Sequence, residues 1–179
     1  MTDEEIIRRV CGGETRMFEE LVRRHQDAVY GMALRFVRSA GDAEDVAQEV
    51  FLTAFRGLAG FKGDAKFSTW LYRVTFNRCA DWLRKNKRPG RRQAPMDEAG
   101  EVADGRVDLA GGLIESEDRD RVRRALDGLE EKYRSVVMLL YYQKLSYEQI
   151  ASVLGVPLKT VETRLYRARK LLRKALEEV

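Results

Sequence analysis

Residues 145–173, LSYEQIASVLGVPLKTVETRLYRARKLLR, constrain the fold more than any other stretch, because they specify two helices and the turn between them. Ser146, followed three residues later by Gln149, has the spacing of a capping box, which starts a helix. Gly155 and then Pro157 predict where that helix ends. A second helix is predicted from about Lys159. Its apolar stripe has steps of three and four residues and consists of Leu158, Val161, Leu165, Ala168 and Leu172.

The side of this second helix that faces away from the stripe is polar and cationic. It carries Lys159, Glu162, Thr163, Tyr166, Arg167 and Lys170. A bracing helix followed by a helix that offers donors and cations is the arrangement of a helix-turn-helix that reads the major groove of DNA. The alternative is an ordinary helical hairpin with a solvated basic face. We favour DNA binding because the cap, the turn and the stripe agree.

The remaining sequence predicts an all-α protein made of two small helical domains. Only 3 of the 179 residues are proline, and no β-branched run alternates with polar residues as a half-buried strand would. Apolar residues make up 44% of the chain, which is enough for helical cores. The net charge of +4 is small, but basic and acidic residues gather in different stretches, so charge still informs the search for partners.

Several classes of function are excluded by what the sequence lacks. Cys11, Cys79 and the single His25 do not provide a disulfide framework or a usual zinc ligand set, and we expect no cofactor. Two isolated cysteines suit a reducing cytosol, so we expect a cytoplasmic protein. No apolar run approaches the roughly 20 residues that span a bilayer, so we expect no membrane insertion. Phosphate-cradling glycine loops and nucleophile–histidine sets are missing, so we expect no enzyme.

Aspartates mark the predicted helix starts in the N-terminal part. Asp3 is expected to cap a helix that ends near Gly12, and Asp42 to cap a helix over residues 43–58. On a helical wheel, residues 43–58 have one apolar side, which we expect to enter the core. This side consists of Ala43, Val46, Ala47, Val50, Ala54 and Leu58.

The outer side of residues 43–58 combines acidic and polar groups with two apolar ones. It consists of Glu44, Asp45, Gln48, Glu49, Leu52 and Phe55. An acidic surface with an apolar centre is typical of a docking site for a basic protein surface. The alternative is that Leu52 and Phe55 pack beneath a neighbouring helix. We favour docking.

A helix rich in aromatic residues follows a predicted loop at residues 60–66. Ser68 or Thr69 is its expected cap, and it reaches about Lys85. The face opposite its core arc consists of Trp70, Arg73, Asn77, Asp81 and Arg84. A ring that stacks on a base, an amide that bonds a base edge and cations that follow phosphates suit single-stranded nucleic acid. A buried Trp70 beside a solvated polar stripe is an equally open alternative.

Glycine, proline and charge predict the domain boundaries. Residues 84–92 are basic without an acid among them, which makes them a candidate phosphate-contacting patch. Residues 94–115 are acidic, rich in glycine and poor in large apolar groups, so we expect a flexible acidic linker. The predicted domains are therefore 1–93 and 116–179. Two helices are expected to support the helix-turn-helix with Val122, Ala125, Leu126 and Leu129 and with Tyr133, Val136, Val137, Leu140 and Tyr141.

Four segments together resemble the extracytoplasmic-function (ECF) sigma factors, the smallest sigma factors of bacterial RNA polymerase in the sigma-70 family. The segments are FEELVRRHQDAVYGMALRFV, DAEDVAQEVFLTAFRGLAGFKGD, FSTWLYRVTFNRCADWLRK and LSYEQIASVLGVPLKTVETRLYRARKLL. The most specific part is DAEDVAQEVF. The resemblance covers nearly the whole chain in matching order and spacing.

The resemblance implies a transcription initiation factor that binds the clamp and flap regions of core RNA polymerase and directs it to promoters. An anti-sigma factor is a further implied partner. The first domain would dock on polymerase through Asp45, Gln48, Glu49, Leu52 and Phe55. It would capture a flipped base of the single-stranded −10 element through Lys62, Lys66, Ser68, Thr69, Trp70, Arg73, Asn77 and Arg84. The second domain would read the −35 duplex through Lys159, Thr160, Glu162, Thr163, Arg164, Tyr166, Arg167 and Lys170.

Two positions depart from the common pattern of this family. Glu162 stands where many relatives have a basic or small residue, and its carboxylate could accept from cytosine N4, so the preferred −35 sequence stays open. Leu129-Glu130-Glu131 replaces the usual Leu-Pro-Glu. The rival hypothesis is a stand-alone helix-turn-helix regulator of duplex DNA, which explains the second domain but neither face of the first.

Overall fold

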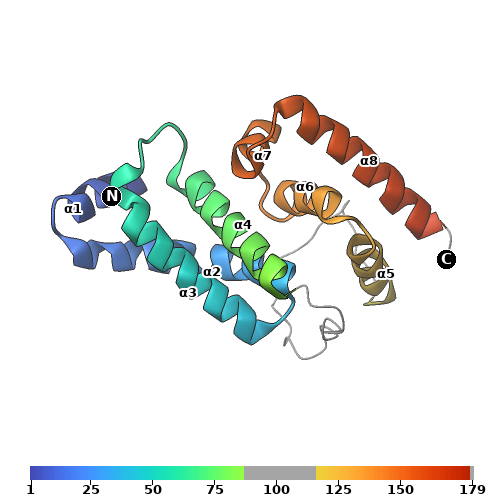
Figure 1. The fold of residues 1–179 in the computed structure, drawn as a ribbon, viewed down its shortest axis with the longest axis horizontal. Helices are drawn as coiled ribbons and strands as arrows, with labels where there is room; N and C mark the ends of the chain where they lie inside the picture. Colours follow the sequence, from blue (N-terminus) through green and yellow to red (C-terminus); the bar gives the residue numbers. More distant parts are fainter. Residues whose placement is uncertain (87–115, 178–179) are drawn as a thin grey trace. The chain divides into compact units, whose positions relative to one another are not determined.

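The computed structural model describes residues 1–86 and 116–177, and every regular element in these two ranges is helical (Figure 1). The all-α prediction is thereby confirmed. The chain divides into two compact units, Met1–Val102 and Ala103–Val179. The predicted acidic linker and the end of the basic stretch, residues 87–92, lie outside the described residues.

Three long helices form the first unit. Its elements are α1 (Asp3–Cys11), η1 (Thr15–Met17), α2 (Phe18–Val37), α3 (Ala40–Gly57), η2 (Leu58–Gly60) and α4 (Phe67–Asn86). Helices α2, α3 and α4 each pack against the other two, and α1 lies against α2. The largest buried side chains of this unit are Phe67, Ile6, Leu21, Met32, Leu71, Val29 and Val50. Within one helix, buried positions such as Val29 and Met32 or Phe67 and Leu71 are three or four residues apart, which gives the helix one core side.

The starts of α1 and α3 differ from the predicted caps. Thr2 caps α1, since its hydroxyl accepts from the Glu5 amide at 3.3 Å and the Glu5 carboxylate accepts from the Thr2 amide at 2.7 Å. Ser39 caps α3, with extended backbone and its hydroxyl 3.4 Å from the Asp42 amide. The predicted caps Asp3 and Asp42 are therefore wrong, because each already lies inside the first helical turn.

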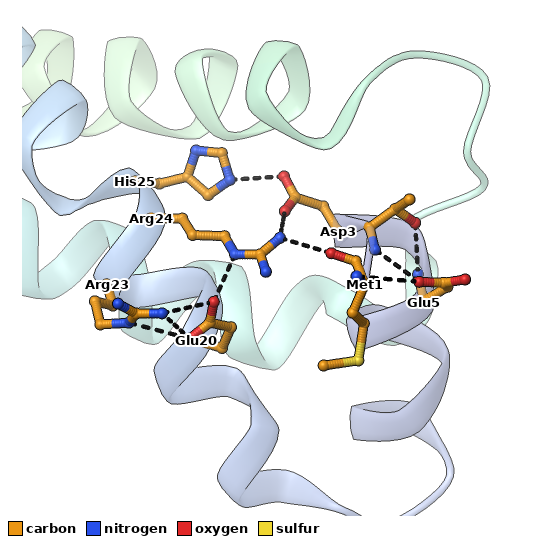
Figure 2. Close-up of polar contacts among 8 residues, drawn as sticks. Met1, Asp3, Glu5, Glu20, Arg23, Arg24 and His25 are labelled. Carbon is orange, nitrogen blue, oxygen red and sulfur yellow. Dashed lines mark hydrogen bonds and ion pairs between the residues drawn. The ribbon is translucent and has the colours of Figure 1, made fainter.

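Asp3 instead fastens α1 to α2. Its carboxylate lies 3.1 Å from Arg24 Nη1 and 2.7 Å from His25 Nε2 (Figure 2). The same Arg24 also donates to Glu20. The pKa of Glu20 is lowered mainly by the hydrogen bond from Arg23 and further by that from Arg24. The His25 ring meets the Phe67 ring edge-on, with centroids 5.3 Å apart. The N-terminal helix is thus connected through α2 to the start of α4.

Four helices form the second unit. They are α5 (Ser116–Asp127), α6 (Glu131–Tyr141), α7 (Tyr147–Leu154) and α8 (Leu158–Glu177). Helix α8 packs against the other three. Near the C-terminal end of α8, the Leu176 carbonyl accepts a hydrogen bond from Arg121 of α5 at 3.1 Å. Leu139 is fully buried, whereas Leu140 is half-buried and Tyr141 is exposed. The predicted inward positions at the end of α6 were therefore wrong by one or two residues.

Three further facts concern the described ranges alone. No helix in them is both long and apolar enough to cross a membrane. They also contain no cluster of three histidine, cysteine or acidic side chains with the geometry of a metal site. Both cysteines are free thiols; Cys11 is exposed, whereas burial raises the pKa of the Cys79 thiol to about 12.

Candidate functional site

The predicted helix-turn-helix is present as α7, a turn and α8. The Ser146 hydroxyl accepts from the Gln149 amide at 3.2 Å, and the Gln149 side chain accepts from the Ser146 amide at 2.8 Å. Gly155 ends α7 in the left-handed conformation, with φ of 65°, which glycine adopts without steric cost. The capping box and the glycine stop are thereby confirmed.

The buried stripe of α8 begins one turn later than predicted. Val161, Leu165 and Ala168 are buried, whereas Leu158 is 40% exposed. Leu158 is the first residue of the helix, so no preceding turn covers its side chain. Three buried contacts with neighbouring helices thus fix which side of α8 faces outward.

Most of the residues predicted to read DNA lie on that outward side. Those exposed are Lys159, Glu162, Thr163, Tyr166, Arg167 and Lys170, whereas Thr160 and Arg164 are half-buried. Tyr166 is 71% exposed, and the Thr163 hydroxyl donates to the Lys159 carbonyl at 2.8 Å. The face therefore presents cations, one carboxylate and one aromatic ring.

Arg169 was missed by the sequence analysis, although it connects α8 to α7. Its Nη2 lies 3.3 Å from the Tyr147 hydroxyl. The pKa of Arg169 is raised mainly by its hydrogen bond to Tyr141 and further by that to Tyr147. The three residues are far apart in sequence, so only the folded unit brings them together and fixes the orientation of α8.

The outer side of α3 carries an apolar patch next to acidic and polar groups. Leu52 is 56% exposed and Phe55 is 41% exposed, so neither is buried beneath a neighbouring helix as the alternative required. Asp45, Gln48 and Glu49 of the predicted docking set are also exposed.

Phe18 of α2 and Phe51 of α3 extend this patch. The Phe18 ring lies edge-on to Phe55 at 5.1 Å and to Phe51 at 6.5 Å between centroids. The Phe18 side chain is half-buried. We call Phe18, Phe51, Leu52 and Phe55 the α3 apolar patch. Packing of Phe18 against Phe55 holds one exposed ring in place.

Trp70 belongs to an aromatic cluster at the start of α4. Its ring centroid lies 5.6 Å from that of Phe61 and 5.7 Å from that of Phe67. A Cβ on Gly57 would lie 3.4 Å from the indole, so the end of α3 closes the other side. Trp70 is half-buried, which lies between the two alternatives that the sequence left open.

The first turn of α4 differs from the prediction. The helix begins at Phe67, and the Trp70 amide donates to the Lys66 carbonyl at 3.2 Å. Ser68 and Thr69 are therefore inside the helix and are not its cap. Thr69 is only 3% exposed, so its side chain does not reach the surface at which DNA contact was expected.

The other residues predicted to bind the −10 element are accessible. Lys62, Lys66, Arg73, Asn77 and Arg84 are exposed, and Ser68 is half-buried. The Arg84 guanidinium lies 2.6 Å from the Asp81 carboxylate, so part of its charge is already compensated. The exposed cations and Asn77 thus lie along the loop and the outer side of α4.

Comparison with known proteins assigns both units. The family model of sigma-70 region 2 matches residues 21–89, and that of sigma-70 region 4 matches residues 119–172. The RNA polymerase sigma-H factor of Pseudomonas aeruginosa is 37% identical over 184 residues, which cover 98% of this chain and 94% of that protein. The ECF RNA polymerase sigma-E factor of Escherichia coli K12 is 35% identical, over 96% of this chain and 93% of that one.

Solved structures agree with this assignment. CnrH, in complex with the cytosolic domain of CnrY, matches with a TM-score of 0.72 and 28% identity over 98% of this chain and 97% of that one. The sigma factor RpoE of Bartonella quintana, in complex with the anti-sigma factor NepR, shares the fold, with a TM-score of 0.67 and 24% identity over 89% of this chain and 96% of that one.

Two helical units, one of them a helix-turn-helix with an outward cationic face, define a DNA-binding transcription factor. The chain belongs to the ECF sigma factors of the sigma-70 family. It is therefore a non-enzymatic initiation factor that binds core RNA polymerase and directs it to promoters. The rival hypothesis of a stand-alone regulator fails because the region 2 match covers the first unit as well.

Proposed function

We propose that the outer side of α3 docks on the clamp of core RNA polymerase through Asp45, Gln48, Glu49, Leu52 and Phe55. The exposed Leu52 and Phe55 carry this proposal, because burying apolar groups at an interface is the main source of affinity. The acidic groups around them provide charge complementarity for a basic partner surface and favour the correct orientation.

The loop before α4 and the outer side of α4 bind the −10 element as single-stranded DNA in this proposal. Lys62, Lys66, Arg73 and Arg84 follow phosphates, and Asn77 selects one base. Ser68 lies at the edge of the site and Trp70 supports it from the aromatic cluster. The buried Thr69 contributes to packing rather than to a direct contact. Unstacking a base costs a few kcal/mol, which binding to this surface offsets.

Helix α8 reads the −35 duplex. Its exposed face carries Lys159, Glu162, Thr163, Tyr166, Arg167 and Lys170, with Thr160 and Arg164 at the margins. Arg164 and Arg167 contact phosphate or guanine, while Thr163 and Tyr166 contact the backbone or a thymine methyl. The second unit also contacts the flap of the polymerase.

We extend the proposal to domain limits, location and regulation. Domains at residues 1–93 and 116–179 connected by residues 94–115 act in the cytoplasm, where core polymerase and DNA meet. In this proposal an anti-sigma factor holds the free protein inactive; RpoE, which shares the fold, is solved in complex with the anti-sigma factor NepR.

Run-off transcription with core polymerase on a promoter pool with randomised −10 and −35 elements tests the proposal. We expect the full chain to confer start sites with a preferred sequence in both elements. Asn77→Ala should change the preference at one −10 base while −35 duplex affinity is retained. If Asn77→Ala reduced transcription equally from promoters with every −10 sequence, Asn77 would have no role in base selection.

A further inference from the structure

The outer face of α8 contains one carboxylate among its cations. Between Leu158 and Glu177 the helix has seven lysines and arginines, whereas its acids are Glu162 and the final Glu177. Glu162 is exposed. In the part of the chain that the structure describes it forms no ion pair, although Lys159 stands three residues before it on the same face.

The position of Glu162 limits what it can contact on a duplex. It lies within the first two turns of α8, and the N-terminal residues of a recognition helix are those that meet base edges. A carboxylate directed at the phosphate backbone would be repelled by like charge. Its favourable orientation is therefore toward the floor of the major groove.

The major-groove edges of the bases differ in what they offer to a carboxylate, which only accepts hydrogen bonds. Cytosine presents the N4 amino donor, whereas guanine presents the acceptors O6 and N7 and thymine presents the acceptor O4. Adenine presents the N6 donor next to the acceptor N7. Cytosine is thus the base edge that attracts a carboxylate without also repelling it.

Neighbouring side chains leave the Glu162 oxygens available. The Thr163 hydroxyl donates to the Lys159 carbonyl at 2.8 Å, so its proton is used within the helix. Tyr166, one turn further on, is 71% exposed. The connection of Arg169 to Tyr147 holds the helix in place two turns beyond Glu162.

We propose that Glu162 selects a cytosine in the −35 element by accepting a hydrogen bond from its N4 amino group. The inference rests on the proposed role of α8 at the −35 duplex and specifies the sequence that this helix reads. Selectivity arises from attraction to cytosine together with repulsion from the acceptors of guanine and thymine.

The test uses the full chain with core polymerase and a promoter pool randomised in the −35 element. We expect one position at which the wild type prefers cytosine by about five- to a hundredfold. Glu162→Ala should remove this preference, and Glu162→Gln should shift it toward adenine, which an amide bonds at N6 and N7. Lys159→Gln, on the same face, should instead weaken all sequences alike.

A modified base tests the contact at a single hydrogen. At the selected position we replace cytosine with N4-methylcytosine, whose methyl group takes the place of the amino hydrogen in the major groove while pairing with guanine persists. Initiation by the wild type should fall by the factor by which it prefers cytosine at this position. Initiation by Glu162→Ala should be the same on both templates. Thermal unfolding of each variant checks that it is folded. We expect this result because Glu162 is exposed and its substitution leaves the core unchanged.

Three results would overturn the inference: a wild type without a cytosine preference at any −35 position, an unchanged preference in Glu162→Ala, or a wild type indifferent to the methyl group. A full chain that starts transcription on no template would contradict the proposed function itself.

Discussion

Helices α3 and α8 are built alike on the inside and differ on the outside. Each buries a stripe of small and branched apolar residues, such as Val46 and Val50 in α3 and Val161 and Leu165 in α8. The outer side of α3 has the apolar patch among acids, whereas the outer side of α8 is dominated by cations. The buried stripe therefore fixes only which side is presented, and the outer residues determine the partner.

The difference also predicts two kinds of binding. An apolar centre gains affinity from the removal of water and depends weakly on salt. A cationic face gains affinity by releasing counterions from DNA and depends strongly on salt.

The largest effect is expected on the α3 side. Leu52→Ala combined with Phe55→Ala should weaken core polymerase binding by at least about 2 kcal/mol, or roughly thirtyfold, because two apolar anchors are removed. Titration of labelled protein with core polymerase measures this affinity. Leu171→Ala is the matched control, since Leu171 of α8 is 43% exposed. Equal losses in both variants would mean that polymerase affinity does not depend on α3 in particular.

The turn before α8 should show the next largest effect. Gly155→Ala should destabilise the protein by about 1–2 kcal/mol, because alanine is strained at a φ of 65° even though nothing lies within 4 Å of the new methyl group. Gly41→Ala, in the first turn of α3 with equally open space, should instead stabilise by about 0.5 kcal/mol. Urea unfolding measures both changes, and changes of the same sign would contradict the backbone argument.

The salt dependence of DNA binding should identify the phosphate contacts of α8. The logarithm of the association constant for a −35 duplex falls linearly with the logarithm of the salt concentration. Arg167→Ala should make this slope shallower by about 0.9, because one phosphate contact is lost. Fluorescence anisotropy at four salt concentrations measures the slope. Arg23→Ala, in the first unit, should leave it unchanged. An unaltered slope in Arg167→Ala would remove Arg167 from the phosphate contacts.

The smallest effect concerns acid stability of the first unit. Hydrogen bonds from Arg23 and Arg24 lower the pKa of Glu20 from its usual 4.5, so the folded state holds its proton less tightly than the unfolded state. The stabilisation is therefore present above about pH 4.5 and is lost as pH falls further. Glu20→Gln should reduce stability at pH 7 and narrow its difference from the wild type near pH 3. Urea unfolding across this range measures the effect, and a constant difference would contradict it.

Local sequence signals predicted the helix-turn-helix well and the first unit less completely. Ser146, Gln149 and Gly155 act within a few residues of one another, so their spacing alone specifies the cap and the stop. The caps at Thr2 and Ser39 were missed because aspartates close by are equally good capping residues. Sequence preference cannot choose between neighbouring candidates when the position of the first turn is set by packing.

Tertiary contacts explain the remaining differences. Trp70 was placed on an outer face by the helical wheel, but the preceding loop brings Phe61 against it. Arg169 meets Tyr147 across two helices, a contact without any local pattern. The exposure of Leu52 and Phe55, in contrast, followed from the wheel alone, because among the described residues only the edge of Phe18 packs against Phe55 and both side chains stay exposed.

Alkylation of the buried Cys79 thiol would report unfolding of the first unit of this sigma factor. A thiolate is the reactive form, and at neutral pH a group with a pKa of about 12 provides almost none of it. Cys11, at the surface, should react with an alkylating reagent at once, whereas Cys79 should react only in molecules whose first unit has come apart. The ratio of Cys79 to Cys11 modification during transcription initiation would measure what fraction of the molecules have an unfolded first unit.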